Sequence, residues 1–198
     1  MKTFILMLTL WMLLGACTKE VAPQQAEPVA PAGETSNPYI RFSIAKGAHY
    51  CDQSAIKPFA GSILRVNVKF DSSAVYSNQD PANQADINKL IGFTEGVNNH
   101  LNSARFGWGW SNNALRLYAY SYAAGVRSSK EISILRIGEP VSLSLSVDGN
   151  EYVFKADEKL VRLPRSLSTP AVEGYWQYPY FGGDEQAPHP INIYIQFL

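Results

Sequence analysis

The chain has 198 residues, with 17 basic and 17 acidic side chains and a formal net charge of zero. This length suits one domain with a sizeable core. The balanced charge gives no reason to expect nucleic acid or an anionic membrane surface as a partner.

The N-terminus has the pattern of a bacterial export signal. Lys2 is followed by an apolar run over residues 4–14 and then by small residues. The run is shorter than the span of about 20 residues that crosses a bilayer. Residues 14–17, Leu-Gly-Ala-Cys, resemble the lipobox of bacterial lipoproteins, which implies cleavage before Cys17 and a lipid on its sulfur. The alternative is an ordinary secretory signal in which the cysteine occurs by chance.

We therefore interpret residues 1–16 as a lipoprotein signal peptide and residues 17–37, rich in Pro, Ala, Gln and Glu, as a disordered tether. The lipid implies attachment to a membrane of the bacterial cell envelope, with the leaflet left open. With Cys17 lipidated, Cys51 has no cysteine partner. We expect Cys51 to be a small buried side chain, with a reactive thiol as the alternative.

Residues 38–198 have the pattern of a β domain. Apolar and polar residues alternate in four clear runs, at residues 40–44, 64–70, 141–147 and 191–197. Such alternation is typical of antiparallel strands with one face buried. Asp80 followed by Pro81 predicts a short helix or a loop that crosses between strands. About ten strands at this spacing predict an all-β fold, a two-sheet antiparallel β-sandwich or a barrel.

Two resemblances extend this prediction. The segment VSLSLSVDGNEYVF, residues 141–154, resembles the central hairpin of concanavalin-A-like jelly rolls, which implies a two-sheet jelly roll. Lectins, glucanases and polysaccharide lyases share that fold. The segments NSARFGWGW, LRLYAYSY and YPYFGGDEQAPH resemble those of uncharacterised bacterial lipoproteins, which implies no activity.

Residues 115–122 predict an aromatic surface that binds a ligand. Alternation places four polar or aromatic side chains on one face of this strand: Arg116, Tyr118, Tyr120 and Tyr122. Sugars present flat C–H faces that stack on aromatic rings, and their hydroxyl groups bind charged or amide side chains. The alternative is that a loop covers these tyrosines or that they belong to the core between the sheets.

Residues 102–110 divide their side chains between two faces. The large rings of Phe106, Trp108 and Trp110 lie on one face. Arg105, Gly107 and Gly109 lie on the other. We expect the tryptophans in the core, and a ligand or another strand close against the glycines. Arg105 needs an acidic partner, which Asp184, Glu185 or an acidic ligand could supply.

Residues 174–189, GYWQYPYFGGDEQAPH, are interpreted as a structured loop before the last strand, because they are too rich in Gly and Pro for an interior strand. Tyr178, Tyr180 and His189 are candidate ligand-binding residues. A lyase could use His189 and Tyr180 for proton transfer and Arg105 to hold an acid group. The chain lacks the Glu-x-Asp-x-x-Glu strand of the glucanases and the Gln-Ile-His strand of the alginate-lyase-like members, which weighs against catalysis.

A metal site has little support in the sequence. Asp184 and Glu185 are weak candidate ligands for calcium, with a solvated acidic turn as the alternative. The three histidines show no zinc spacing, and no other cofactor is indicated.

Three hypotheses follow for the function. The first is a lipid-anchored, non-catalytic protein that binds an oligo- or polysaccharide. The second is a polysaccharide lyase or glycoside hydrolase of the same fold. The third is a structural or protein-interaction lipoprotein whose aromatic side chains all lie in the core.

Overall fold

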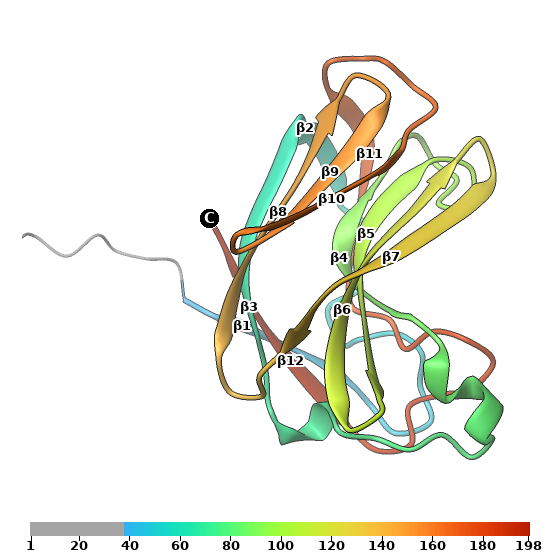
Figure 1. Ribbon diagram of the computed structural model, residues 1–198, viewed down its shortest axis with the longest axis vertical. Helices are drawn as coiled ribbons and strands as arrows, with labels where there is room; N and C mark the ends of the chain where they lie inside the picture. Colours follow the sequence, from blue (N-terminus) through green and yellow to red (C-terminus); the bar gives the residue numbers. More distant parts are fainter. Residues whose placement is uncertain (1–37) are drawn as a thin grey trace, which may run out of the picture. The chain divides into compact units, whose positions relative to one another are not determined.

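The computed structural model describes residues 38–198, so the interpretations of residues 1–37 lie outside the described residues. The described part forms two antiparallel sheets of six strands each, packed face to face (Figure 1). The prediction of an all-β, two-sheet antiparallel sandwich is confirmed. Within this part of the chain the helices are short, and none could span a membrane.

The first sheet contains the four strands that the alternation predicted. Its strands, in spatial order, are β1 (Ile40–Ile44), β12 (Ile191–Phe197), β3 (Ile63–Phe70), β8 (Pro140–Asp148), β9 (Glu151–Ala156) and β10 (Lys159–Pro164). The predicted runs form β1, β12, β3 and β8, which are neighbours in this sheet. Strands β8 and β9 pair as the expected hairpin, with Asp148 opposite Glu151.

The second sheet carries the longer strands and the candidate site. Its order is β2 (Pro58–Gly61), β11 (Val172–Gln177), β4 (Asn88–Thr94), β5 (Ser103–Ser111), β6 (Ala114–Ala123) and β7 (Val126–Leu135). Two-residue turns at 112–113 and 124–125, with positive φ at both residues of each, join β5, β6 and β7. Such turns match the right-handed twist of the flanking strands.

Two 3-10 helices, η1 (Ser72–Ala74) and η2 (Pro81–Ala85), lie between β3 and β4. The Asp80 side chain accepts a hydrogen bond of 2.8 Å from the backbone N–H of Ala82, and Pro81 opens η2. Of the two alternatives predicted at this place, a short helix or a loop, the structure shows a short 3-10 helix.

The core lies between the inner faces of the two sheets. Phe106 of β5 meets Phe154 of β9 edge-on, with ring centroids 5.3 Å apart, and Trp108 lies 5.4 Å from Phe70. Both β5 rings are fully buried, as expected from the alternation. Cys51 is also buried and unpaired, and burial raises the pKa of its thiol, which disfavours the reactive thiolate.

The interpretation of residues 174–189 as a loop is wrong at its start. Residues Val172–Gln177 form β11, an interior strand whose first part pairs with β2 and whose end pairs with β4. A Cβ atom on Gly174 would collide with the backbone oxygen of Thr94. Glycine therefore allows a close approach of two backbones inside the sheet, where the sequence suggested a loop.

Candidate functional site

The candidate site lies on the outer face of the second sheet, which points away from the core. In β6 the core takes Leu115, Leu117 and Ala119, so the intervening side chains point outward. The antiparallel register aligns residues of five neighbouring strands in one row, from β11 to β7: Gln177, Gly92, Arg105, Tyr120 and Ser129. We call this set the Arg105 row.

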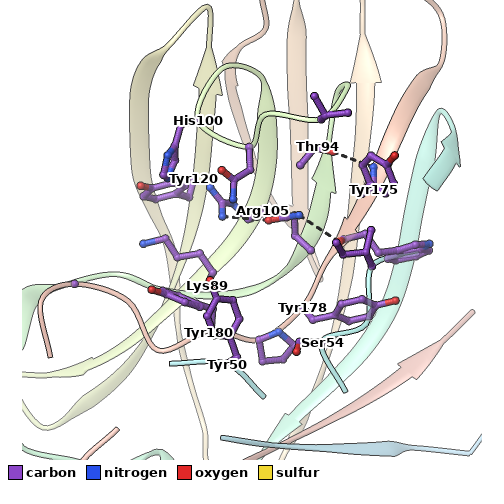
Figure 2. A pocket seen from close by; sticks show the side chains of 17 residues that line it. Tyr50, Ser54, Lys89, Thr94, His100, Arg105, Tyr120, Tyr175, Tyr178 and Tyr180 are labelled. Atoms are coloured by element: carbon purple, nitrogen blue, oxygen red, sulfur yellow. Dashed lines mark hydrogen bonds between the residues drawn. The ribbon is translucent and has the colours of Figure 1, made fainter. Parts of the chain in front are cut away.

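A cavity of about 700 Å³ is lined by three members of the Arg105 row, Gln177, Arg105 and Tyr120 (Figure 2). Its walls come from the sheet, from the β1–β2 and β4–β5 connections and from the segment that follows β11. Six aromatic side chains line it: Tyr50, Tyr120, Tyr175, Trp176, Tyr178 and Tyr180. Two cations, Lys89 and Arg105, also line it, and none of the described residues in its lining is Asp or Glu. The cavity is therefore aromatic and positively charged.

Arg105 lies in the floor of the cavity and is only 6% exposed. Its Nη1 donates one long hydrogen bond of 3.5 Å to Gln177 Oε1, and its Cζ lies 5.4 Å from the Tyr120 ring centroid. Among the described residues, neither Nε nor Nη2 has a hydrogen-bond partner. Burial lowers the pKa of this guanidinium. A buried cation with unpaired N–H groups is costly, and a carboxylate can accept two of its hydrogen bonds at once.

Gly92 explains how the Arg105 side chain fits beside β4. The two residues are opposite each other in the register, and a Cβ atom on Gly92 would lie 2.8 Å from Arg105 Cγ. The glycine thus leaves space for the arginine to cross β4 toward Gln177 of β11. Three strands act together to position one guanidinium.

Lys89 of β4 supplies the second positive charge. Its Nζ donates a 2.6 Å hydrogen bond to the backbone oxygen of Ile87 and lies 4.5 Å from the Tyr120 ring centroid. Burial, followed by the charge of Arg105, lowers the pKa of Lys89 to about 8. Lys89 is therefore mostly charged at neutral pH and becomes neutral in mildly alkaline solution.

The segment that follows β11 is fixed to the rest of the chain by buried and charged contacts. The Gly182 N–H donates to Asn88 Oδ1 at 2.7 Å, and Tyr180 exchanges two backbone hydrogen bonds with Lys89 at 2.9 and 3.0 Å. The Glu185 carboxylate accepts hydrogen bonds from the backbone of Asp80 and Gln79, and these lower its pKa. These contacts fix the segment in place as one wall of the cavity.

The Tyr180 ring belongs to a small aromatic group on this wall. It stacks on His49, with centroids 5.3 Å apart, and meets Tyr50 edge-on at 5.0 Å. His49 Nδ1 donates to the Phe181 backbone oxygen at 2.8 Å. These contacts hold Tyr180 toward the cavity, where Figure 2 shows it between Lys89 and Tyr50.

The structure brings four of the sequence-predicted ligand residues to one cavity: Arg105, Tyr120, Tyr178 and Tyr180. Tyr122 lies next to them, with its hydroxyl 3.5 Å from that of Tyr120. His189 is half-buried and, among the described residues, is not part of the cavity lining. A lyase mechanism that uses this cavity therefore needs a base other than His189.

Arg116 and Tyr118 share the outer face with Tyr120 but lie outside the cavity. Arg116 forms an ion pair of 2.9 Å with Glu131 of β7. Both Tyr118 and Tyr122 are half-buried, and Tyr120 is buried although it lines the cavity. The third hypothesis placed these rings in the core, whereas the register places them on the opposite face of the sheet.

The glycine face of β5 is covered by the chain itself. A Cβ atom on Gly107 would collide with Ile87 Cγ2, and one on Gly109 would lie 3.3 Å from the backbone oxygen of Asp86. The two predicted alternatives for this face were a ligand or another strand, and the structure shows neither: the connection between η2 and β4 covers it.

The acidic pair 184–185 does not reach Arg105. Glu185 is bound to the segment at η2, as described above, and no ion pair joins Arg105 to either carboxylate in the described residues. Within residues 38–198, no three His, Cys, Asp or Glu side chains are placed to hold a metal ion. Neither Asp184 nor Glu185 is therefore the acidic partner that the sequence suggested for Arg105.

Sequence reasoning missed Lys89 and Gln177 as site residues. A bulge between Lys89 and Ile91 shifts the register of β4, so the alternation of its residues does not show which face Lys89 takes. Gln177 gave no signal, because its role depends on β11 pairing with β4.

No protein-family model and no curated protein matches this sequence, so the resemblance to bacterial lipoproteins stays a prediction. Solved structures do match. Alginate lyase AlyC3 matches with a TM-score of 0.52 at 9% identity, over 81% of this chain and 74% of that one. Its complex with dimannuronate matches with a TM-score of 0.50 at 8% identity, over 82% and 71%. A β-glucanase from Bacillus licheniformis matches with a TM-score of 0.43 at 13% identity, over 80% and 76%. The chain has the concanavalin-A-like jelly-roll fold, as the hairpin resemblance implied.

Proposed function

We propose that this protein binds carbohydrate without catalysis, and that the ligand in its cavity is an acidic saccharide. The observation that carries the proposal is Arg105, a buried guanidinium with two unpaired nitrogens in an aromatic cavity lined by no described Asp or Glu. The fold shared with an alginate lyase that binds dimannuronate supports a saccharide as the ligand.

The cavity supplies the groups that an acidic sugar needs. A carboxylate at Arg105 accepts the unpaired N–H groups, and such bidentate pairs are among the stronger hydrogen bonds in proteins. Lys89 lies beside the same Tyr120 ring and adds a second positive charge. The rings of Tyr178 and Tyr180 offer flat faces for the C–H surface of the sugar.

Calorimetric titration of the full chain tests the proposal. Dimannuronate, and maltose as a neutral disaccharide of the same size, are titrated under identical conditions. We expect dimannuronate to bind at least about 30-fold more tightly, the ratio that corresponds to about 2 kcal/mol for a buried charge pair. Equal binding of both sugars, or binding of neither, would contradict the proposal.

Lys89 makes the binding dependent on pH. Since its pKa in the folded protein is about 8, it loses its charge as the pH rises through that value. The affinity for dimannuronate should therefore fall roughly ten-fold between about pH 6 and about pH 10, the loss of one hydrogen bond to a charged group. In the variant Lys89→Met this decrease should disappear, while weak binding through Arg105 remains. A decrease of the same size in the variant would show that another group titrates.

A polysaccharide lyase is the second candidate, and the position of Lys89 favours it. In β-elimination a base removes the proton alpha to a carboxylate, the C–O bond to the leaving sugar breaks, a C=C bond forms, and the leaving oxygen takes a proton. Lys89 in its neutral form and the Tyr180 hydroxyl are groups of the right kind in one cavity, with Arg105 at the carboxylate. Incubation with polymannuronate, followed by ultraviolet absorbance of the unsaturated product, separates the two candidates. New absorbance shows the lyase, and unchanged absorbance with retained binding shows the binding protein.

We also propose that the protein is anchored by a lipid on Cys17 in a bacterial cell envelope. The support is the lipobox-like Leu-Gly-Ala-Cys sequence after an apolar run. Mass spectrometry of the protein from its native membrane should find an acylated Cys17 as the first residue, and an intact Met1 would contradict the anchor.

A further inference from the structure

The outer face of the second sheet continues beyond the cavity to β7. In the register Tyr120 is opposite Ser129 and Tyr122 is opposite Arg127, so Arg127 shares the face of Arg105. Arg105 on β5 and Arg127 on β7 are two interstrand spacings apart, about 10 Å, and the register offsets them by two residues, about 7 Å, along the strands, so their backbones lie about 12 Å apart. This separation is roughly that of two linked sugar rings.

Arg127 is an exposed cation with no acidic partner. None of the ion pairs or hydrogen bonds among the described residues involves its side chain. The acidic residue nearest to it on this face of β7 is Glu131, which Arg116 binds at 2.9 Å. Burial and Arg105 are the main causes of the lowered Lys89 pKa, but Arg127 contributes, which places it within electrostatic range of the cavity.

An aromatic surface connects the two arginines. The Tyr120 and Tyr122 rings lie 5.8 Å apart, and the His100 ring lies 5.2 Å from Tyr122. Tyr120 lines the cavity, and Tyr122 is next to Arg127 in the register. A sugar chain that leaves the cavity in this direction therefore crosses aromatic side chains before it reaches Arg127.

We propose that the ligand is an oligo- or polysaccharide with acidic groups on successive sugars. It runs from the cavity across β6 to β7, and Arg127 binds a second acidic group about two sugar rings from the one at Arg105. The inference rests on the proposed function, because Arg105 has to hold the first acidic group. It adds that one acidic sugar fills only part of the site and that the binding strength depends on the length of the chain.

Titrations of the full chain with dimannuronate and tetramannuronate test this length dependence. The variant Arg127→Gln should bind tetramannuronate three- to five-fold more weakly than the wild type, the loss expected for one exposed ion pair of up to about 1 kcal/mol, and should bind dimannuronate equally well. Lys130→Gln is the matched control. It removes the same charge from the same strand, but Lys130 is opposite Ala119, whose side chain faces the core. We expect it to bind both saccharides as the wild type does.

The outcomes separate the two proposals. If Arg127→Gln and Lys130→Gln lose the same affinity for tetramannuronate, or if Arg127→Gln loses none, Arg127 does not have the proposed role. Binding of dimannuronate by the wild type would in that case still support the cavity as the binding site. If the wild type binds neither saccharide, the proposed function fails and the extension fails with it.

Discussion

Replacement of Arg105 by methionine should abolish detectable binding of dimannuronate and leave the domain at least as stable as the wild type. The loss should exceed about 30-fold, because a buried charge partner is worth roughly 2 kcal/mol or more. The free energy of unfolding, in contrast, should stay the same or rise. Arg105 is 6% exposed and has two unpaired nitrogens, so its removal relieves the cost of burying a cation. Methionine has a similar length and fills the space beside Gly92.

Calorimetric titration and thermal unfolding of the same samples check both parts. Arg136→Met is the matched control, since the Arg136 side chain is 81% exposed and the substitution removes the same charge. The control should bind normally and unfold at an unchanged temperature. A variant at position 105 that binds normally would refute the role of Arg105, and one that loses several kcal/mol of stability would show that the guanidinium holds the fold together.

Replacement of Glu95 by alanine should lower the free energy of unfolding by about 3–5 kcal/mol, the cost of leaving one buried charge unpaired. Glu95 directly follows β4 and is buried with Arg165. Arg165 Nε and Nη2 donate to its two carboxylate oxygens at 2.7 and 2.8 Å, and the Tyr152 hydroxyl donates at 2.6 Å. Without Glu95, the Tyr152 hydroxyl loses its acceptor and Arg165 loses its only anionic partner among the described residues, and the guanidinium keeps only neutral acceptors on Gly149 and Thr169.

Urea unfolding measures this loss. The double variant Glu95→Ala/Arg165→Met should be more stable than Glu95→Ala alone, because it removes the unpaired cation as well. Asp148→Ala is the control: it breaks an exposed ion pair with Arg162 and should cost at most about 1 kcal/mol. A loss in Glu95→Ala no larger than in this control would show that the buried pair contributes little.

The loop after Glu95 makes the same variant informative about the site. Val97, Asn99 and His100 follow it in the chain and line the cavity. We therefore expect weaker binding of dimannuronate in Glu95→Ala even at temperatures where the domain stays folded.

The strands that could be predicted from sequence are those with one buried face and one more solvent-exposed face. In β8, for example, Val141, Leu143 and Leu145 are buried and the serines between them are more exposed, so alternation marks the strand. In β4 every residue except Lys89 is buried, and a bulge interrupts the register. Its alternation disappears for that reason. Strand β11 was not predicted, because Gly174 suggested a loop. Its role, a close contact with the Thr94 backbone, appears only in the three-dimensional structure.

The candidate site could be predicted only in part, for a related reason. Arg105 is the one charged side chain in residues 103–111, and Tyr120 belongs to the polar and aromatic face of residues 115–122, so both could be selected from their own strands. Lys89, Gln177 and Arg127 acquire their roles from pairing between strands that are distant in the sequence. Arg116 and Tyr118 were predicted as ligand-binding residues but lie outside the cavity. They share the alternation of Tyr120, but Glu131 pairs with Arg116 across the register, which a single strand cannot reveal.

The position of β12 between β1 and β3 constrains the order in which the protein can fold. β12 follows all the other strands in the chain, yet it lies in the interior of the first sheet. β1 therefore cannot join the rest of this sheet until residues 191–197 pair with both neighbours. β2 likewise depends on β11 for its pairing in the second sheet. Contacts between residues so far apart along the chain make folding slow, because the chain has to close long loops before these strands can pair. Until β12 pairs with both of them, β1 and β3 therefore each keep an exposed edge.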